Sequence, residues 1–464
     1  MQNANNISIE SMVTGASQTY TQIKDTLDNL KEEGIYRSID HELLCSRPKL
    51  SEQQTYHTID EAIAQNGKNY MGVIYFHIPF CESTCSYCPY LNIPIANGKS
   101  VIDTYLDSMI KELSEYKEKF GILNASALYF GGGTPTSLTS KQIRKLFDAI
   151  KQHVTITDHT EITYEVSPVS LKKEGKEKLA ALKDAGVTRI SVGVQTFNKD
   201  ILKECGRITS DEYTVDNAIK QIRDAGFHNV NIDLIYGLPT QKIEDFATDL
   251  TKAVALKPTS VTTYHLRLED NTTFKNRYLN ELGFKEKIPI YTNDSETIRM
   301  KIMATAYLER QGYHQMPTDW FVKDEGAHIA QYKKWHDQES LLGIGVSAYS
   351  SFGNGLKFKV LGNIADRMGS IREYISRITE GKPVIDSLKM QKKDERMDSN
   401  TALGLKTGVS LEQFKAVYNQ ELFAHYPNAA RLIQLGALKI EDGELRLTAI
   451  GELLAEEVAA KLVQ

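Results

Sequence analysis

Short apolar stretches alternate with amphipathic helical segments along the middle of this chain, and this alternation restricts the possible folds more than any other feature of the sequence. The stretches that predict strands are residues 72–77, 127–130, 161–166, 189–194, 229–235 and 260–264. The clearest helical segments between and after them are residues 100–120, 140–153, 177–185, 211–225 and 243–256. Strand–helix units in series are typical of a parallel sheet, which forms either a barrel or a doubly wound sheet.

The segments outside this repeat have other patterns. Residues 20–33 and 296–311 show helical periodicity, and residues 340–352 suit a last strand with its loop. Near the end, two short strand patterns flank Asp442-Gly443, which predicts a hairpin between helices, as in a winged-helix-like domain. We therefore expect an N-terminal helical extension (1–70), a core barrel (71–290), a barrel extension with a substrate-pocket segment (291–370) and a C-terminal domain (371–464).

The composition of the 464 residues excludes several classes of protein. Charged residues make up 25% of the chain, the net charge is −5, and charge interrupts every apolar run before it is long enough to cross a bilayer. We expect neither a membrane nor a nucleic acid as a partner. Five cysteines are too few for a disulfide scaffold in a chain of this length, so we expect a cytoplasmic location.

Three of the five cysteines, Cys81, Cys85 and Cys88, lie together directly after the first predicted strand. Three thiolates on one loop can hold three irons of a [4Fe–4S] cluster and leave the fourth iron open to a cofactor or substrate. Two alternatives remain. The same cysteines with His77 could bind zinc, which accepts three Cys and one His, or they could be structural residues that cluster by chance.

Three consecutive glycines, Gly131, Gly132 and Gly133, follow the second predicted strand and precede Thr134-Pro135. Because glycine has no side chain, backbone N–H and C=O groups can approach a ligand closely at such a place. A tight turn alone would also explain the glycines. Their position at the carboxyl end of a barrel strand, where ligands of barrel enzymes bind, favours the first interpretation.

These motifs together resemble the radical S-adenosylmethionine (SAM) enzymes, and in particular the branch that is similar to oxygen-independent coproporphyrinogen III oxidase, often called HemN-like. The segments that carry the resemblance are residues 75–88, 129–136, 165–168, 191–198, 206–207, 231–239 and 343–350. The fold that we expect is therefore α/β: an incomplete parallel (β/α)6 TIM-like barrel with a helical N-terminal extension and a small winged-helix-like C-terminal domain.

The resemblance implies roles for individual residues. Cys81, Cys85 and Cys88 would hold the cluster. Reductive cleavage of SAM would give methionine and a 5′-deoxyadenosyl radical, with the electron coming from a donor such as flavodoxin or ferredoxin. The residues implied at this first SAM are Tyr75, Gly131, Gly132, Gly133 and Glu165, of which Tyr75 and Glu165 would lie nearest the chemistry.

Some members of the family bind a second SAM beside the first. The positions that match here are Tyr87, Gly133, Thr134, Gln195, Arg207 and Asp233, and Arg267 and Tyr349 are further candidates for the same pocket. Arg207 suits a carboxylate and Asp233 suits an ammonium or hydroxyl group. An alternative is that Arg207 and Asp233 pair with each other as a buried structural bridge.

Departures from the family pattern leave three functions open. Tyr90 stands where coproporphyrinogen oxidases have a further cysteine, and residues 328–335 only partly match the heme-binding motif of the heme carriers. The first function is radical chemistry on a bulky, conjugated small molecule, with a second SAM as methyl or methylene donor (C-methylation or cyclopropanation). The second is a tetrapyrrole enzyme, either a coproporphyrinogen III dehydrogenase or an anaerobic heme-degrading enzyme. The third is a non-catalytic heme chaperone.

Overall fold

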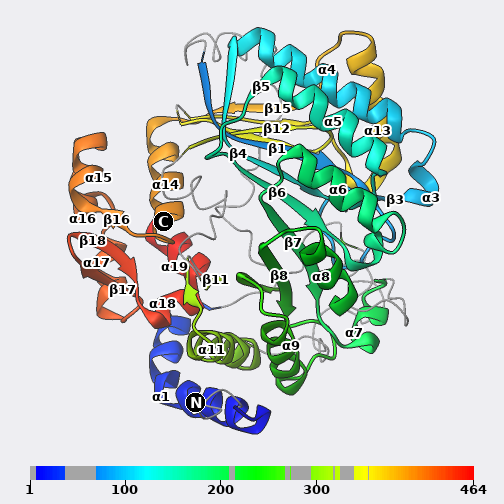
Figure 1. Ribbon diagram of the computed structural model, residues 1–464. Helices are drawn as coiled ribbons and strands as arrows, with labels where there is room; N and C mark the ends of the chain where they lie inside the picture. Colours follow the sequence, from blue (N-terminus) through cyan, green and yellow to red (C-terminus); the bar gives the residue numbers. More distant parts are fainter. Residues whose placement is uncertain are drawn as a thin grey trace.

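A computed structural model of the chain shows an open, curved sheet with helices on its outer side and a small helical domain across its open side (Figure 1). The structure describes residues 7–36, 69–207, 215–266, 272, 294–316, 319–323, 339–353 and 355–464. The region around Arg267, the partial heme motif at 328–335 and the first residues of the helix expected at 211–225 lie outside the described residues.

Six parallel strands form the centre of the sheet, and each lies beside the strand that precedes it in the chain. They are β1 (Asn69–Ile78), β4 (Ile122–Gly132), β6 (Glu161–Val166), β7 (Arg189–Gln195), β8 (Asn229–Tyr236) and β9 (Ser260–His265). The order β1-β4-β6-β7-β8-β9 never reverses. A doubly wound sheet would reverse direction at a switch point, so this order identifies the barrel topology predicted from the sequence.

The sheet extends beyond the predicted six strands at both ends. β12 (Ser340–Ile344) lies parallel to β1 on its free edge, as a seventh parallel strand, and the antiparallel strands β13 (Tyr349–Ser351), β14 (Leu356–Val360) and β15 (Ile385–Met390) follow it. At the other end, β11 (Trp320–Val322) and β10 (His314–Gln315) continue antiparallel from β9, and the short β5 (Val154–Thr155) pairs with β4. The described strands β10 and β15 at the two ends do not pair, so the barrel is incomplete.

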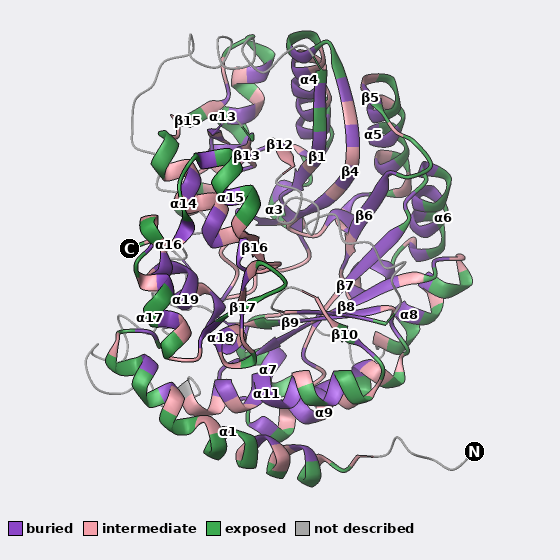
Figure 2. Cartoon of the chain, turned by 90° about the vertical axis from the view of Figure 1, so that its left-hand side faces the viewer, coloured by how far each residue is buried: buried purple, intermediate pink, exposed green. Residues whose placement is uncertain are grey.

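The helices that follow the strands cover the outer face of the sheet (Figure 1). They are α4 (Ile102–Phe120), α5 (Ser140–His153), α6 (Gly175–Ala185), α8 (Val215–Asp224) and α9 (Ile243–Ala255), with the short α7 (Lys199–Glu204) beside α8. In α5, the buried residues Ile143, Leu146, Phe147 and Ile150 repeat at helical spacing, and the Thr139 hydroxyl caps the first turn. Exposed residues gather on the outward sides of such helices, while the strands are largely buried (Figure 2).

Three further helices pack around the ends of the barrel. α1 (Ile9–Glu32) lies against α11 (Asp294–Arg310) and α9, near the β9 end of the sheet. α13 (Arg367–Thr379) packs on α4. Short elements connect these parts: β2 (Phe80–Cys81), β3 (Ile93–Pro94), α3 (Ile95–Gly98) and single 3-10 turns at Pro135–Ser137, Pro168–Leu171 and Ile364–Asp366.

The C-terminal segment forms a small domain of helices and a three-stranded sheet. Its elements are α14 (Lys393–Gly404), β16 (Val409–Ser410), α15 (Leu411–Tyr418), α16 (Leu422–His425), α17 (Asn428–Gln434), β17 (Leu438–Glu441), β18 (Glu444–Leu447), α18 (Ala449–Leu453) and α19 (Ala455–Leu462). Asp442 and Gly443 both have positive φ and form the predicted hairpin turn. This is the winged-helix-like domain that we expected, and its last two helices face the open side of the barrel.

No helix in the described part of the chain is both long and apolar enough to span a bilayer.

Candidate active site

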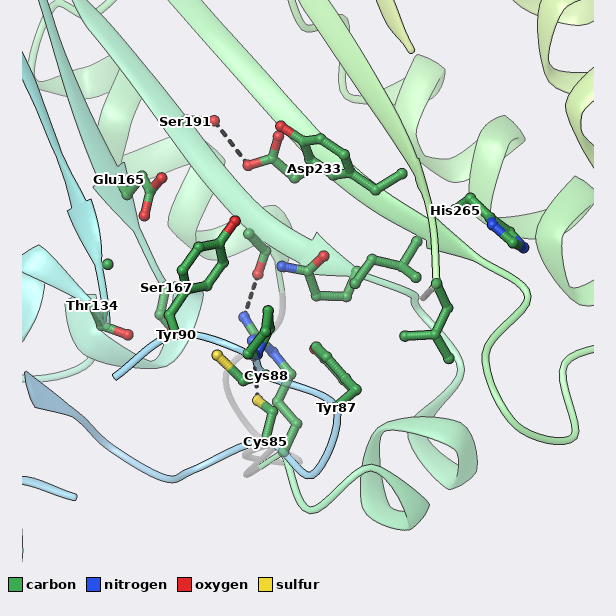
Figure 3. Close-up of a pocket in the computed structure, with 18 of the residues that line it drawn as sticks. Cys85, Tyr87, Cys88, Tyr90, Thr134, Glu165, Ser167, Ser191, Asp233 and His265 are labelled. Atoms are coloured by element: carbon green, nitrogen blue, oxygen red, sulfur yellow. Dashed lines mark hydrogen bonds between the residues drawn. The ribbon is translucent and has the colours of Figure 1, made fainter. Parts of the chain in front are cut away.

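A cavity of about 430 Å³ opens at the carboxyl ends of the parallel strands (Figure 3). Its barrel side is formed by residues of the cysteine loop, the glycine turn and the ends of β6 to β9. Its other side is formed by the C-terminal domain. We call this second side the cap wall, and it consists of Glu452, Leu453, Ala455, Glu456 and Glu457. The cavity therefore lies where barrel enzymes bind their ligands, and the C-terminal domain covers it.

The three cysteines of the loop after β1 all line this cavity. Cys81 is buried at the end of β2, whereas Cys85 and Cys88 are partly exposed. The backbone holds the loop at two places: Ser86 donates its N–H to the carbonyl of Cys205 (2.9 Å), and Thr134 donates its N–H to the carbonyl of Phe80 (2.8 Å). The loop thus has a defined position between the glycine turn and the end of α7.

Each of the three thiols has one side-chain donor from a different part of the chain. The Thr134 hydroxyl lies 3.5 Å from the Cys81 sulfur, a guanidinium N–H of Arg207 lies 3.6 Å from the Cys85 sulfur, and the Asn92 amide lies 3.2 Å from the Cys88 sulfur. Burial raises the pKa of Cys81 to about 12 and that of Cys88 to about 11. Bound metal would reverse this effect, because a coordinating thiol loses its proton.

The surroundings of His77 argue against the zinc alternative. Its Nε2 lies 2.9 Å from the carbonyl oxygen of Leu91, and its Nδ1 lies 3.0 Å from the Tyr75 hydroxyl, so both ring nitrogens already have protein partners. Within the described residues, no three His, Cys, Asp or Glu side chains group closely enough to ligate a single metal ion. Three thiols that face one cavity, each with a hydrogen-bond donor, fit the multi-iron cluster better than one zinc ion.

The glycine turn has no room for side chains. A Cβ on Gly132, whose φ is +108°, would lie 2.5 Å from the His77 ring, and one on Gly133 would lie 3.0 Å from the Cys81 sulfur. A Cβ on Gly131 would lie 2.9 Å from the Glu165 carboxylate. Gly132 and Gly133 line the cavity, so their backbone can approach a ligand there. Packing against the protein itself thus already requires glycine at this turn, and ligand binding by its backbone stays a prediction.

Glu165, at the end of β6, faces the cavity (Figure 3). The Tyr129 hydroxyl donates to its Oε1 (2.7 Å). Burial is the main cause that raises the pKa of Glu165 to about 7. The nearby Asp233 also raises this pKa, whereas the hydrogen bond from Tyr129 lowers it. A carboxyl group with this pKa ionises readily when a cationic ligand, such as an amino group, binds beside it.

Arg207 and Asp233 do not form the structural bridge that the sequence left open. Asp233 accepts hydrogen bonds from the Ser191 hydroxyl (2.8 Å) and the Asn231 amide (2.7 Å). Arg207 instead donates to the Gly193 carbonyl and approaches the Cys85 sulfur. Both residues line the cavity, so each can contact a ligand that binds there.

The other predicted residues divide into two groups. Tyr87, Thr134 and Gln195 line the cavity, and the buried Oε1 of Gln195 has no hydrogen-bond partner among the described residues. The cavity lining does not include Tyr75, Gly131 or Tyr349: Tyr75 lies on β1 beside His77, Gly131 lies behind Glu165 on β4, and Tyr349 begins β13. Arg267 lies outside the described residues.

Several lining residues were not predicted as site residues. Tyr90 is 51% exposed and Tyr264 is 40% exposed, and Figure 3 shows the Tyr90 ring pointing from the cysteine loop toward Glu165 and Asp233. Tyr129, Ser191, Asn92, His265 and the cap wall also belong to the lining. Ser191 stands in a segment that carries the family resemblance and within a predicted strand, which could have indicated it. No comparable signal marked Asn92 or the cap wall.

Comparisons with known proteins agree with the predicted family and fold. The model of the radical SAM superfamily matches residues 75–253. The chain is 31% identical over 391 residues to the heme chaperone HemW of Bacillus subtilis, which covers 83% of this chain and 97% of that protein. It is 30% identical over 294 residues to the oxygen-independent coproporphyrinogen III oxidase of Salmonella typhimurium (61% and 62%). The structure of coproporphyrinogen III oxidase (HemN) from Escherichia coli has the same fold, with a TM-score of 0.76 at 24% identity over 93% of this chain and 98% of that one.

Proposed function

Because the chain belongs to the HemN-like family of radical SAM proteins, we propose that it is an enzyme that reductively cleaves SAM at a [4Fe–4S] cluster and acts on a bulky, conjugated small molecule. One observation carries this proposal: three thiols, each with its own donor, face the same cavity as Glu165 and the glycine turn.

When bound, the cluster supplies the electron that cleaves SAM to methionine and a 5′-deoxyadenosyl radical, and the external donor is a protein such as flavodoxin or ferredoxin. Cys81, Cys85 and Cys88 hold the cluster. Gly132, Gly133 and Glu165 line the cavity beside these cysteines, where the glycine backbone would meet the methionine part of SAM and the Glu165 carboxylate would accept a hydrogen bond from it. The cap wall covers the side of the cavity opposite the barrel strands, which would shield reactive species from bulk water.

The aromatic lining supports a conjugated substrate. The exposed rings of Tyr90 and Tyr264 stand in the cavity with Tyr129 and Tyr236. Aromatic rings stack on planar π systems and add about 0.5–1.5 kcal/mol per pair beyond the area that they bury. A second SAM that serves as methyl or methylene donor belongs to the same proposal, with Arg207 beside its carboxylate and Asp233 beside a donor group.

The test of the proposal begins with anaerobic reconstitution of the full chain. We expect about four irons per chain and, with reductant and SAM, formation of 5′-deoxyadenosine. Stoichiometric zinc in place of iron, or a cluster that leaves SAM intact, contradicts the proposal. A mass increase of a candidate substrate then indicates methyl or methylene addition, whereas a mass decrease indicates decarboxylation.

The second SAM has its own test. Replacing Arg207 by alanine removes a charge-assisted contact worth about 2–5 kcal/mol, so the second site should lose roughly 30-fold or more in affinity. The expected result is continued 5′-deoxyadenosine formation with loss of substrate product. If labelled SAM binds the wild type with a stoichiometry of one, the two-SAM part of the proposal is wrong.

A heme carrier is the second candidate function, because the similarity to the heme chaperone HemW of Bacillus subtilis extends over 97% of that protein. Heme binding together with an inability to form 5′-deoxyadenosine from SAM would favour the carrier over the enzyme.

A further inference from the structure

Asn92 is a buried amide whose hydrogen bonds all lie around the cysteine loop. Its side chain is 1% exposed and is held between Cys88, Tyr90 and Arg367. The amide N–H groups lie 3.2 Å from the Cys88 sulfur and 2.9 Å from the Tyr90 carbonyl. Of the three donors to the thiols, it makes the shortest contact, and it is the one that does not belong to the residues implied at either SAM.

Arg367 determines which end of this amide faces the sulfur. Its Nη1 lies 3.2 Å from the Asn92 Oδ1 and 3.0 Å from the Asn92 backbone carbonyl. A guanidinium group can only donate hydrogen bonds, and the Tyr90 carbonyl can only accept them. The amide oxygen must therefore face Arg367, and the NH2 group must face Cys88 and Tyr90.

Arg367 reaches the cysteine loop from a distant part of the fold. It is the first residue of α13, 275 positions after Asn92 in the chain, and its Nε also donates to the Ile364 carbonyl (3.2 Å). The helix α13 packs on α4, outside the barrel. The barrel extension and the cysteine loop are thus connected through one arginine and one amide.

We propose that Asn92 is a positioning residue that raises the reduction potential of the cluster through its N–H···S hydrogen bond to Cys88, and that Arg367 acts through it by orienting the amide. This inference rests on the proposed function, since it requires the cluster. In the redox step, one electron passes from an external one-electron donor to the oxidised cluster, and no bond breaks. The reduced cluster carries one more negative charge, so a donor at its thiolate stabilises the reduced form more than the oxidised form.

The experiment is a redox titration of the reconstituted full chain without SAM, monitored by the electron paramagnetic resonance signal of the reduced cluster. Asn92→Ala should lower the reduction equilibrium constant about tenfold, which is about 59 mV for a one-electron couple. Asn92→Asp, which replaces the donor by an anion, should lower it further. The matched control is Asn97→Asp, the same change at an exposed position on α3, which should keep the wild-type potential.

Arg367→Lys separates orientation from charge, because it keeps the positive charge but loses the Nε–H that donates to the Ile364 carbonyl and so fixes the direction of Nη1 toward Asn92. We expect a smaller decrease than in Asn92→Ala, and no additional decrease when Arg367→Lys is combined with Asn92→Ala. If Asn92→Ala cannot hold a cluster, the potential of Arg367→Lys decides. The inference is wrong if Asn92→Ala holds a cluster with the wild-type reduction potential. If Asn92→Ala holds no cluster, the inference is wrong if Arg367→Lys has the wild-type reduction potential. A wild-type chain that takes up no four-iron cluster instead shows that the proposed function has failed.

Discussion

Two glutamates in different regions of the molecule have similar hydrogen bonds but different surroundings. Glu165 stands at the barrel cavity, and Glu112 stands in the packed junction between α4 and α13. Each carboxylate accepts a tyrosine hydroxyl, from Tyr129 (2.7 Å) for Glu165 and from Tyr374 (2.6 Å) for Glu112. Each also accepts a glycine N–H, and burial raises the pKa of each to about 7.

The difference between the two regions is what the carboxylate faces. Glu165 lines a cavity, together with Asp233 and the cysteine loop. Glu112 is 1% exposed and packs against Gly345, where an added Cβ would lie 2.5 Å from the Tyr105 hydroxyl and leave no room for a ligand. A raised pKa therefore does not identify a functional residue by itself. It does so only together with an open space and further ligand-binding groups.

The largest expected effect comes from comparing two cysteines, one that lines the cavity and one in packed surroundings. Cys85 lines the cavity, whereas Cys205 is fully buried at the end of α7. Cys85→Ala should reduce 5′-deoxyadenosine formation to background, because the cluster loses one of its three ligands. Cys205→Ala should retain the iron content and the activity. Equal losses in both variants would remove the distinction between the cavity and the packed interior.

The next effect concerns SAM affinity. Glu165→Gln keeps the shape of the side chain but loses its charge, so the affinity of the reconstituted protein for SAM should decrease about tenfold to a hundredfold. Glu112→Gln makes the same change in the packed junction and should leave the affinity unchanged. Equilibrium binding of labelled SAM measures both. An unchanged affinity in Glu165→Gln would show that this carboxylate does not contact SAM.

The third effect concerns the dependence of stability on pH. The pKa of Glu112 is about 7 in the folded chain and 4.5 in the unfolded chain, so the folded state binds the proton more tightly. The stability from the protonated carboxyl is fully present below pH 4.5 and is lost as the pH rises toward 7, by up to about 3 kcal/mol.

Glu112→Gln cannot ionise and should lose none of this stability. The urea midpoint of Glu112→Gln relative to wild type should therefore increase between pH 4.5 and pH 8. Glu165→Gln should show the same trend, because burial also raises the pKa of Glu165 to about 7. A constant difference across this range would show that the pKa of Glu112 is the same in the folded and unfolded states.

Local patterns predicted the barrel and most of its site, since strand and helix periodicity and the positions of the cysteines and glycines are properties of neighbouring residues. The parallel strands, Glu165, Arg207 and Asp233 follow from such patterns and from the family resemblance. The hydrogen-bond partners of Arg207 and Asp233 could not be predicted in this way, because each charged side chain could pair with several different groups. The cap wall and the contact between Asn92 and Arg367 join residues hundreds of positions apart, and a single sequence contains no local signal for them.

The pairing of β1 with β12 affects how the chain folds during synthesis. Gly72 pairs with Ser340, so β1 has one free edge until nearly three quarters of the chain has been made. At about 5–20 residues per second, this delay lasts on the order of tens of seconds. An unpaired strand edge promotes association with other chains, and this edge belongs to the strand that leads into the cysteine loop. We therefore expect yields of folded protein to depend more on substitutions in residues 340–344 than on comparable substitutions in β9.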